Sequence, residues 1–252
     1  MDQITLRFHP INVPIDGGYV TAKGLYGLFF KALREADPEE TNWLHDHPPP
    51  KPFSLVPLYA DNGVLVGLRL GIVTPRAAQL FIRAWEWHRA RQSRLAFSRQ
   101  TFVVNEIQYA AGPGWAQLIE AHPARIVELE FLSPTTFRQR PSHLPLPVPY
   151  NVFYGLWRIW QTYAPSAAIP DNWLDWCRQE LFVTDVNIHT APIYITSADT
   201  LSGFVGRAVF KVNKGTREQL SLLHALGWLA TYTGVGCKTS MGMGAVALLS
   251  AA

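Results

Sequence analysis

Apolar and polar residues in the first part of the chain alternate with two different periods. Ile4, Leu6 and Phe8 are separated by single residues, which predicts a strand with one buried face. The elements expected after this strand are a helix over 22–35, strands over 53–59 and 64–73, a helix over 75–94 and a strand over 101–109. Read in order, the pattern is βαββαβ, which is the ferredoxin-like plan.

The second part of the chain repeats this order. The expected elements are a strand over 125–131, helices over 152–163 and 172–180, strands over 183–196 and 204–212, a helix over 216–232 and a final strand over 245–249. Thr216 and Gln219 have the spacing of a capping box at the start of the last helix. We therefore expect an α+β protein with two similar domains, residues 1–118 and 119–252, joined around 112–123.

A glycine-rich loop separates the last predicted helix from the last strand. Its backbone can turn N–H groups toward an anion, and a lysine adds positive charge. The loop residues expected to contact phosphate are Gly234, Gly236, Lys238, Thr239, Ser240, Gly242 and Gly244. The alternative is a turn whose glycines serve packing alone.

The loop does not match the common nucleotide-binding motifs. Cys237 separates Gly236 from Lys238, and the helix precedes the loop, whereas a P-loop opens a helix. Thr239 stands where the dinucleotide fingerprint has its third glycine. A nucleotide-binding enzyme is therefore disfavoured, and the backbone phosphates of a polymer become the expected ligand.

The charge distribution agrees with a polyanionic partner. The net charge is only +3, but the chain from Leu201 onward carries five basic residues and one acid. In the strand over 204–212, Arg207 and Lys211 fall on one face, opposite Phe204 and Phe210. Together with Lys214 and Lys238 they are expected to form a basic strip that holds a polyanion.

Composition limits the remaining possibilities. The two cysteines give neither a disulfide framework nor a metal-binding spacing, and no third ligand accompanies His45 and His47, so we expect no metal and no cofactor. The chain shows no signal-peptide core and no stretch able to span a bilayer, which predicts a cytoplasmic protein without a membrane partner.

Four segments, in this order, resemble a known family. They are Leu44-His45 with 51–54 and 57–58, Phe131–Phe137 (FLSPTTF), Gly203–Phe210 (GFVGRAVF) and Gly234–Gly244 (GVGCKTSMGMG). They are similar to the motifs of the CRISPR-associated endoribonucleases that cut repeat RNA during guide-RNA maturation. The resemblance implies tandem ferredoxin-like (RRM-like) domains followed by the glycine-rich loop.

The same resemblance implies a metal-independent reaction. The ribose 2′-OH attacks the neighbouring phosphate and leaves 5′-hydroxyl and 2′,3′-cyclic phosphate ends. Histidine suits the proton transfers because its ordinary pKa is about 6.5. His45 and Lys51 lie six residues apart in what we expect to be a proline-rich loop after the first helix. They are the predicted acid or base and the predicted phosphate stabiliser, with Tyr26 as a helper and His47 as the alternative histidine.

A rival function from another class remains open. A member of the same superfamily could bind CRISPR repeat RNA without cutting it, as a subunit of a defence complex. In either case the expected partners are the repeat RNA and subunits of a CRISPR effector complex, and a homodimer is left open.

Overall fold

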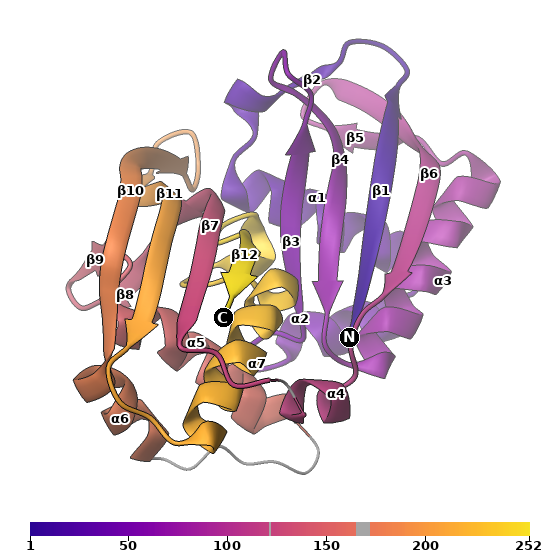
Figure 1. Ribbon diagram of the computed structural model, residues 1–252. Coiled ribbons are helices and arrows are strands. Elements are labelled where there is room, and N and C mark those ends of the chain that lie inside the picture. The colour runs from indigo at the N-terminus through magenta and orange to yellow at the C-terminus, as the bar shows by residue number, and fades with distance from the viewer. Residues whose placement is uncertain (121, 165–171) are drawn as a thin grey trace. The chain divides into compact units, whose positions relative to one another are not determined.

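The computed structural model describes residues 1–120, 122–164 and 172–252, and its elements follow the predicted order in both halves (Figure 1). Contacts divide the chain into two units. Unit 1 consists of Met1–Gly112, Tyr194–Thr200 and Ser240–Gly242; unit 2 consists of Pro113–Ile193, Leu201–Thr239 and Met243–Ala252. The division therefore falls at Gly112, and unit 1 also takes two short segments from later in the chain.

Unit 1 is built on one antiparallel sheet. Its strands are β1 (Asp2–Pro10), β2 (Ile15–Asp16), β3 (Phe53–Tyr59), β4 (Val64–Ile72), β5 (Leu95–Phe97) and β6 (Gln100–Ala111). Its helices are α1 (Ala22–Ala36), α2 (Pro38–Asp46) and α3 (Pro75–Arg91), with a 3-10 turn at Gly17–Tyr19. Neighbouring strands run β3-β4-β1-β6, all antiparallel. This is the strand order of a ferredoxin-like βαββαβ unit, so the predicted plan is confirmed here.

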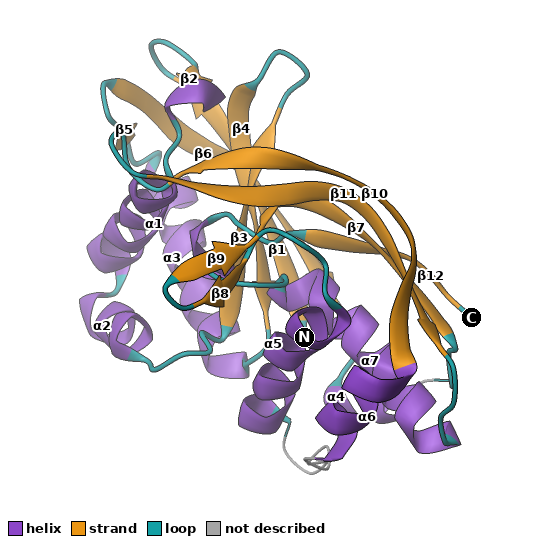
Figure 2. Ribbon diagram, turned by 90° about the vertical axis from the view of Figure 1, so that its left-hand side faces the viewer, coloured by secondary structure: helices purple, strands orange, loops and turns teal. Residues whose placement is uncertain are grey.

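Helices α1 and α3 cover one face of this sheet (Figures 1 and 2). The alternation in β1 is confirmed, since Ile4, Leu6 and Phe8 are all buried. Phe29 of α1 lies 5.2 Å from Phe53 of β3 and 5.3 Å from Phe81 of α3, measured between ring centroids. Burying such rings stabilises the fold by about 1.5–3 kcal/mol each, so this cluster fixes α1 on the sheet.

Helix α2 was not predicted, and it changes the setting of His45. It begins after Asp37, whose side chain accepts a hydrogen bond from the amide of Glu40 at 3.2 Å, and Pro38 occupies its first turn. His45 lies in the last turn of this helix. The expectation that His45 sits in a loop is therefore wrong.

Unit 2 repeats the same arrangement. Its strands are β7 (Ile126–Thr135), β8 (Phe137–Gln139), β9 (Ser142–Leu144), β10 (Leu181–Tyr194), β11 (Thr200–Val212) and β12 (Val246–Ala251). Its helices are α4 (Trp115–Ile119), α5 (Pro149–Tyr163), α6 (Asn172–Glu180) and α7 (Arg217–Thr233), with a 3-10 turn at Thr239–Met241. The sheet order β10-β11-β7-β12 is again the ferredoxin-like one, and β8 and β9 form a separate hairpin. The tandem fold is thus confirmed.

The capping box predicted for the last helix is present. The hydroxyl of Thr216 accepts a hydrogen bond from the amide of Gln219 at 3.2 Å, and the Gln219 side chain accepts one from the amide of Thr216 at 2.9 Å. The capping box therefore fixes the start of helix α7, and the glycine-rich loop follows directly after the end of this helix. Across the part of the chain that the structure describes, no helix combines the length and apolarity needed to cross a membrane.

Candidate active site and RNA-binding loop

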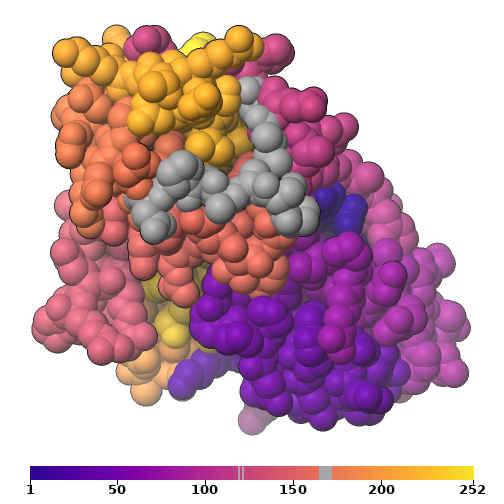
Figure 3. Space-filling view, turned by 90° about the horizontal axis from the view of Figure 1, so that it is seen from below, coloured from indigo at the N-terminus to yellow at the C-terminus, as the bar shows by residue number. Residues whose placement is uncertain are grey.

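His45 is exposed at the C-terminal end of α2, which forms part of the surface of unit 1 (purple in Figure 3). Its Nδ1 lies 3.1 Å from Oδ1 of Asp46, and its ring meets the ring of Phe30 edge-on, 5.3 Å between centroids. A carboxylate can only accept a hydrogen bond, so Asp46 favours the tautomer that carries its proton on Nδ1. Nε2 is then the nitrogen able to exchange a proton with a substrate.

Tyr26 of α1 lies near His45, as the sequence predicts. The two ring centroids are 6.3 Å apart, and the Tyr26 ring also packs on Phe30 at 4.5 Å. Burial raises the pKa of the Tyr26 hydroxyl above its ordinary value. The hydroxyl therefore stays protonated at neutral pH and can serve as a hydrogen-bond donor.

Lys51 has a different setting from the one predicted. Its ammonium donates hydrogen bonds to the carbonyl oxygens of Leu44 (3.1 Å), His45 (2.6 Å) and His47 (2.6 Å). Burial lowers the pKa of Lys51, while the charge of Asp46 opposes that shift. All three protons of the ammonium thus point at the backbone, so these contacts do not support the predicted role as a phosphate stabiliser.

His47 is held more tightly than His45. Its Nδ1 lies 2.8 Å from the carbonyl oxygen of Pro48, and its ring meets Trp43 edge-on at 5.7 Å between centroids. The side chain is half-buried, whereas that of His45 is exposed. Of the two histidines, His45 is the better placed to reach a substrate.

The glycine-rich loop is anchored to the end of β7 by its backbone. The amide of Gly244 donates to the carbonyl of Pro134 at 3.2 Å, and the amide of Cys237 donates to the carbonyl of Thr136 at 3.0 Å. A third bond, from the amide of Val235 to the carbonyl of Gly244 at 2.8 Å, closes the loop on itself. The shape of the loop is therefore set by the backbone.

All four predicted loop glycines have the left-handed backbone that favours glycine. Their φ angles are 68° at Gly234, 89° at Gly236, 96° at Gly242 and 70° at Gly244. Lys238, between them, also has a positive φ of 58°. The loop segment Ser240–Gly242 belongs to unit 1, where a Cβ on Gly242 would lie 3.0 Å from Leu25 of α1. The tip of the loop thus packs beside the residue that precedes Tyr26.

Acidic side chains lie beside Arg207 on the sheet face of unit 2, where part of the basic strip is predicted. Arg207 is exposed there with Lys211, but its Nε lies 2.7 Å from Oε1 of Glu128, and Asp185 is 3.9 Å from its Nη2. In the β11–β7 register Arg207 faces Glu130, a further acid on the same face. Around Arg207 and Lys211 the acids therefore offset the positive charge, and the rest of the predicted strip depends on Lys214 and Lys238. Lys214, at the end of β11, donates its backbone amide to Glu180 at 3.0 Å.

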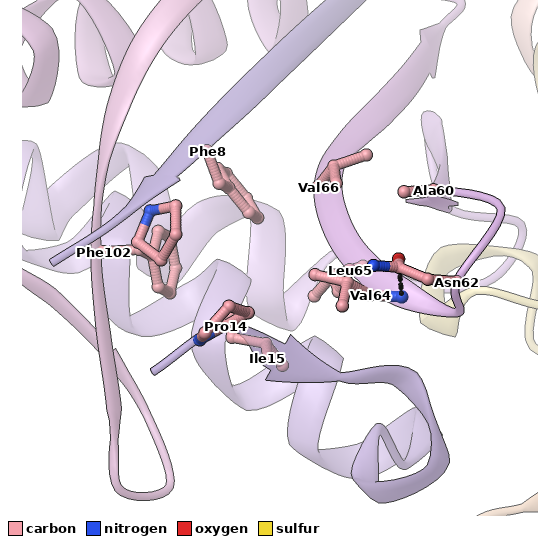
Figure 4. A pocket seen from close by; sticks show the side chains of 10 residues that line it. Phe8, Pro14, Ile15, Ala60, Asn62, Val64, Leu65, Val66 and Phe102 are labelled. Atoms are coloured by element: carbon pink, nitrogen blue, oxygen red, sulfur yellow. Dashed lines mark hydrogen bonds between the residues drawn. The ribbon is translucent and has the colours of Figure 1, made fainter. Parts of the chain in front are cut away.

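An apolar hollow of about 190 Å³ lies elsewhere in unit 1 (Figure 4). Its lining includes Phe8 of β1, Ile15 of β2, Leu65 of β4 and Phe102 of β6. None of the residues predicted for catalysis or RNA binding lines it. The hollow is therefore separate from the candidate active site.

Comparison with known proteins identifies relatives of this chain. The family model of CRISPR-associated endoribonuclease Cas6 matches residues 129–246. The CRISPR-associated endoribonuclease Cas6 of Mycobacterium tuberculosis is 30% identical over 133 residues, which are 52% of this chain and 42% of that protein. The match thus spans less than half the length of this curated relative.

Solved structures extend the similarity along the whole chain. A Cas6 product complex has a TM-score of 0.85 at 26% identity, covering 99% of each chain. A second Cas6 product complex has a TM-score of 0.79 at 27% identity, covering 99% of this chain and 100% of that one. Thermus thermophilus Cas6 has a TM-score of 0.76 at 26% identity, covering 98% of each chain. The tandem fold, the family model and the curated relative thus all make this chain similar to the CRISPR-associated endoribonucleases Cas6.

Proposed function

We propose that this protein is an endoribonuclease that cleaves CRISPR repeat RNA without a metal ion, using His45 for proton transfer. The observation that carries the proposal is the exposed His45 ring, oriented by Asp46 at 3.1 Å and placed beside Tyr26. The match to the Cas6 family model over residues 129–246 and the similarity to Cas6 product complexes support RNA as the substrate. Cleavage is expected to give two RNA fragments, one that begins with a 5′-hydroxyl and one that ends in a 2′,3′-cyclic phosphate.

The proposed reaction uses a nucleophile that the RNA itself provides. The 2′-oxygen forms a bond to phosphorus as its proton departs, and the bond from phosphorus to the 5′-oxygen breaks as that oxygen gains a proton. Nε2 of His45 can take up the first proton or deliver the second, because an imidazole nitrogen can act as either a base or an acid. The protonated hydroxyl of Tyr26 can donate a hydrogen bond to the charged phosphate oxygens.

The glycine-rich loop is proposed to hold the RNA backbone. Lys238 supplies charge, and the hydroxyls of Thr239 and Ser240 supply donors, all on half-buried residues between the anchored glycines. The loop glycines Gly234, Gly236, Gly242 and Gly244 give the loop its path. Lys211 and Lys214 remain secondary candidates, whereas Arg207 is neutralised by Glu128.

The proposed site of action is the cytoplasm, where the precursor RNA is transcribed. The proposed partners are the repeat RNA and the effector-complex subunits that receive its product.

The experiment that tests the function is an incubation with cognate repeat RNA in excess EDTA. We expect cleavage at one position, with 5′-hydroxyl and 2′,3′-cyclic phosphate ends identified by mass spectrometry. RNA that stays bound but intact, with and without added divalent metal, would instead favour a non-catalytic subunit of a defence complex. Cleavage that stops in EDTA and returns with metal would contradict the metal-independent mechanism.

A matched pair of variants tests the proposed RNA contacts. Lys238→Gln removes the charge at a similar side-chain length, so we expect the dissociation constant to rise about three- to tenfold and the salt slope of binding to fall by about 1. Arg207→Gln removes a charge that is already paired with Glu128, so its effect should be smaller. Fluorescence anisotropy at several salt concentrations measures both. Equal losses in the two variants would contradict the assignment of the loop as the principal contact.

A further inference from the structure

Helix α2 is closed by one backbone donor, the amide of His47, and the three residues that follow it offer no further backbone donors. The last carbonyl groups of a helix have no partner within it, and amides of the following residues often satisfy them. Here the three residues after His47 are Pro48, Pro49 and Pro50, and proline has no N–H. The carbonyls at the end of α2 therefore need a donor from elsewhere.

Lys51 provides that donor from a side chain. Its Nζ lies 3.1 Å from the carbonyl oxygen of Leu44, 2.6 Å from that of His45 and 2.6 Å from that of His47. A positive charge at a helix C-terminus is favourable because the exposed carbonyls carry partial negative charge. One ammonium thus holds three carbonyls of the turn that bears His45.

The other end of this turn is fixed by packing. Leu44 is fully buried in the core of unit 1. The His45 ring rests edge-on against Phe30, and its Nδ1 meets Asp46. With the backbone held by Lys51 and the side chain held by Phe30 and Asp46, the direction of Nε2 is set before any substrate binds.

We propose that Lys51 is a positioning residue that orients His45 through the backbone of α2. This inference rests on the proposed function for its effect on catalysis, and it replaces the direct phosphate contact expected from the sequence. It also accounts for the combination of three prolines and a lysine after α2, since the lysine supplies the hydrogen bonds that the prolines cannot.

The first test uses the free protein and needs no RNA. The amide of His47 donates to the carbonyl of Trp43 at 3.0 Å. In Lys51→Met we expect this amide hydrogen to exchange with solvent at least about tenfold faster than in the wild type. Lys31→Met, at an exposed lysine of α1, is the matched control and should leave that exchange rate unchanged. Unchanged exchange in Lys51→Met would overturn the inference, whatever the protein does to RNA.

The second test separates positioning from phosphate contact by cleavage rates. Arginine binds phosphate well, but its planar fork does not match three converging carbonyls. We therefore expect Lys51→Arg to lose single-turnover cleavage about as strongly as Lys51→Met, by about tenfold or more. Retention of the rate in Lys51→Arg, with loss in Lys51→Met, would show a charge acting on the phosphate and would overturn the inference.

A double-mutant comparison provides the third test. If Lys51 acts through His45, then Lys51→Met should add little to the loss already caused by His45→Ala. If Lys51 touches the phosphate, the residual rate of His45→Ala should fall further by the same factor as in the wild-type background, which would overturn the inference. If neither the wild type nor any variant cleaves RNA, the proposed function is contradicted. The role of Lys51 in holding the end of α2 is then decided by the hydrogen-exchange experiment alone.

Discussion

Replacing His45 with alanine is expected to lower single-turnover cleavage of repeat RNA by about 10²–10⁴-fold, the usual contribution of a general acid or base. The change removes the one ring whose Nε2 is directed outward by Asp46. RNA affinity should change by no more than about twofold, because lysine and arginine contacts to phosphates supply most of the binding free energy. Rapid-quench kinetics with excess protein measure the rate, and anisotropy measures the affinity.

His47→Ala is the matched control for this substitution. His47 lies two residues away but is half-buried against Trp43, with Nδ1 bonded to the Pro48 carbonyl. We expect the cleavage rate of His47→Ala to stay near that of the wild type. Circular dichroism checks that the variant is folded. A full rate in His45→Ala together with a lost rate in His47→Ala would transfer the catalytic role to His47 and would leave the proposed RNA cleavage unchanged.

Gly244→Ala is expected to destabilise the glycine-rich loop strongly. A Cβ at Gly244 would lie only 2.0 Å from the carbonyl oxygen of Val235, and the backbone there has a φ of 70°. The left-handed backbone costs an alanine about 1–2 kcal/mol and the steric overlap about 1–3 kcal/mol more. We therefore expect a loss of about 2–5 kcal/mol in the free energy of unfolding, measured by urea denaturation, and weaker RNA binding.

Gly155→Ala is the control for the glycine substitution. Gly155 lies inside α5 of the same unit, and a Cβ there would meet no atom within 4 Å. Alanine in a helix interior is favoured over glycine by about 0.5–1 kcal/mol, so this variant should be slightly more stable than the wild type. Equal stability of Gly244→Ala and Gly155→Ala would show that the loop can rearrange at no cost.

Much of the fold could be predicted because its elements carry strong periodic patterns. The strand expected over 53–59 matches β3, and the helix expected over 172–180 matches α6. Helix α2 was missed because it has only nine residues and buries just Thr41 and Leu44, too few for a visible period. Its start was nevertheless marked in the sequence by Asp37 followed by Pro38.

The candidate site was predicted in part. Tyr26 and His45 lie together as expected, because both elements that carry them pack in one core. The contacts of Lys51 were not foreseen, although the run of prolines before it signals a helix end with few backbone donors. The acids that pair with Arg207, Glu128 and Asp185, belong to β7 and β10, so only the folded sheet shows that they offset its charge.

Unit 1 assembles from three separate stretches of the chain, and this has a consequence for dissecting the molecule. The amide of Lys23 donates to the carbonyl of Ile195 at 3.1 Å, and Leu25 is covered by the Gly242 segment. A fragment ending at Gly112 would lack both partners. Although the strands and helices before Gly112 follow a complete ferredoxin-like topology, we expect a fragment of these residues alone to leave the Lys23 amide and the Leu25 side chain exposed to water.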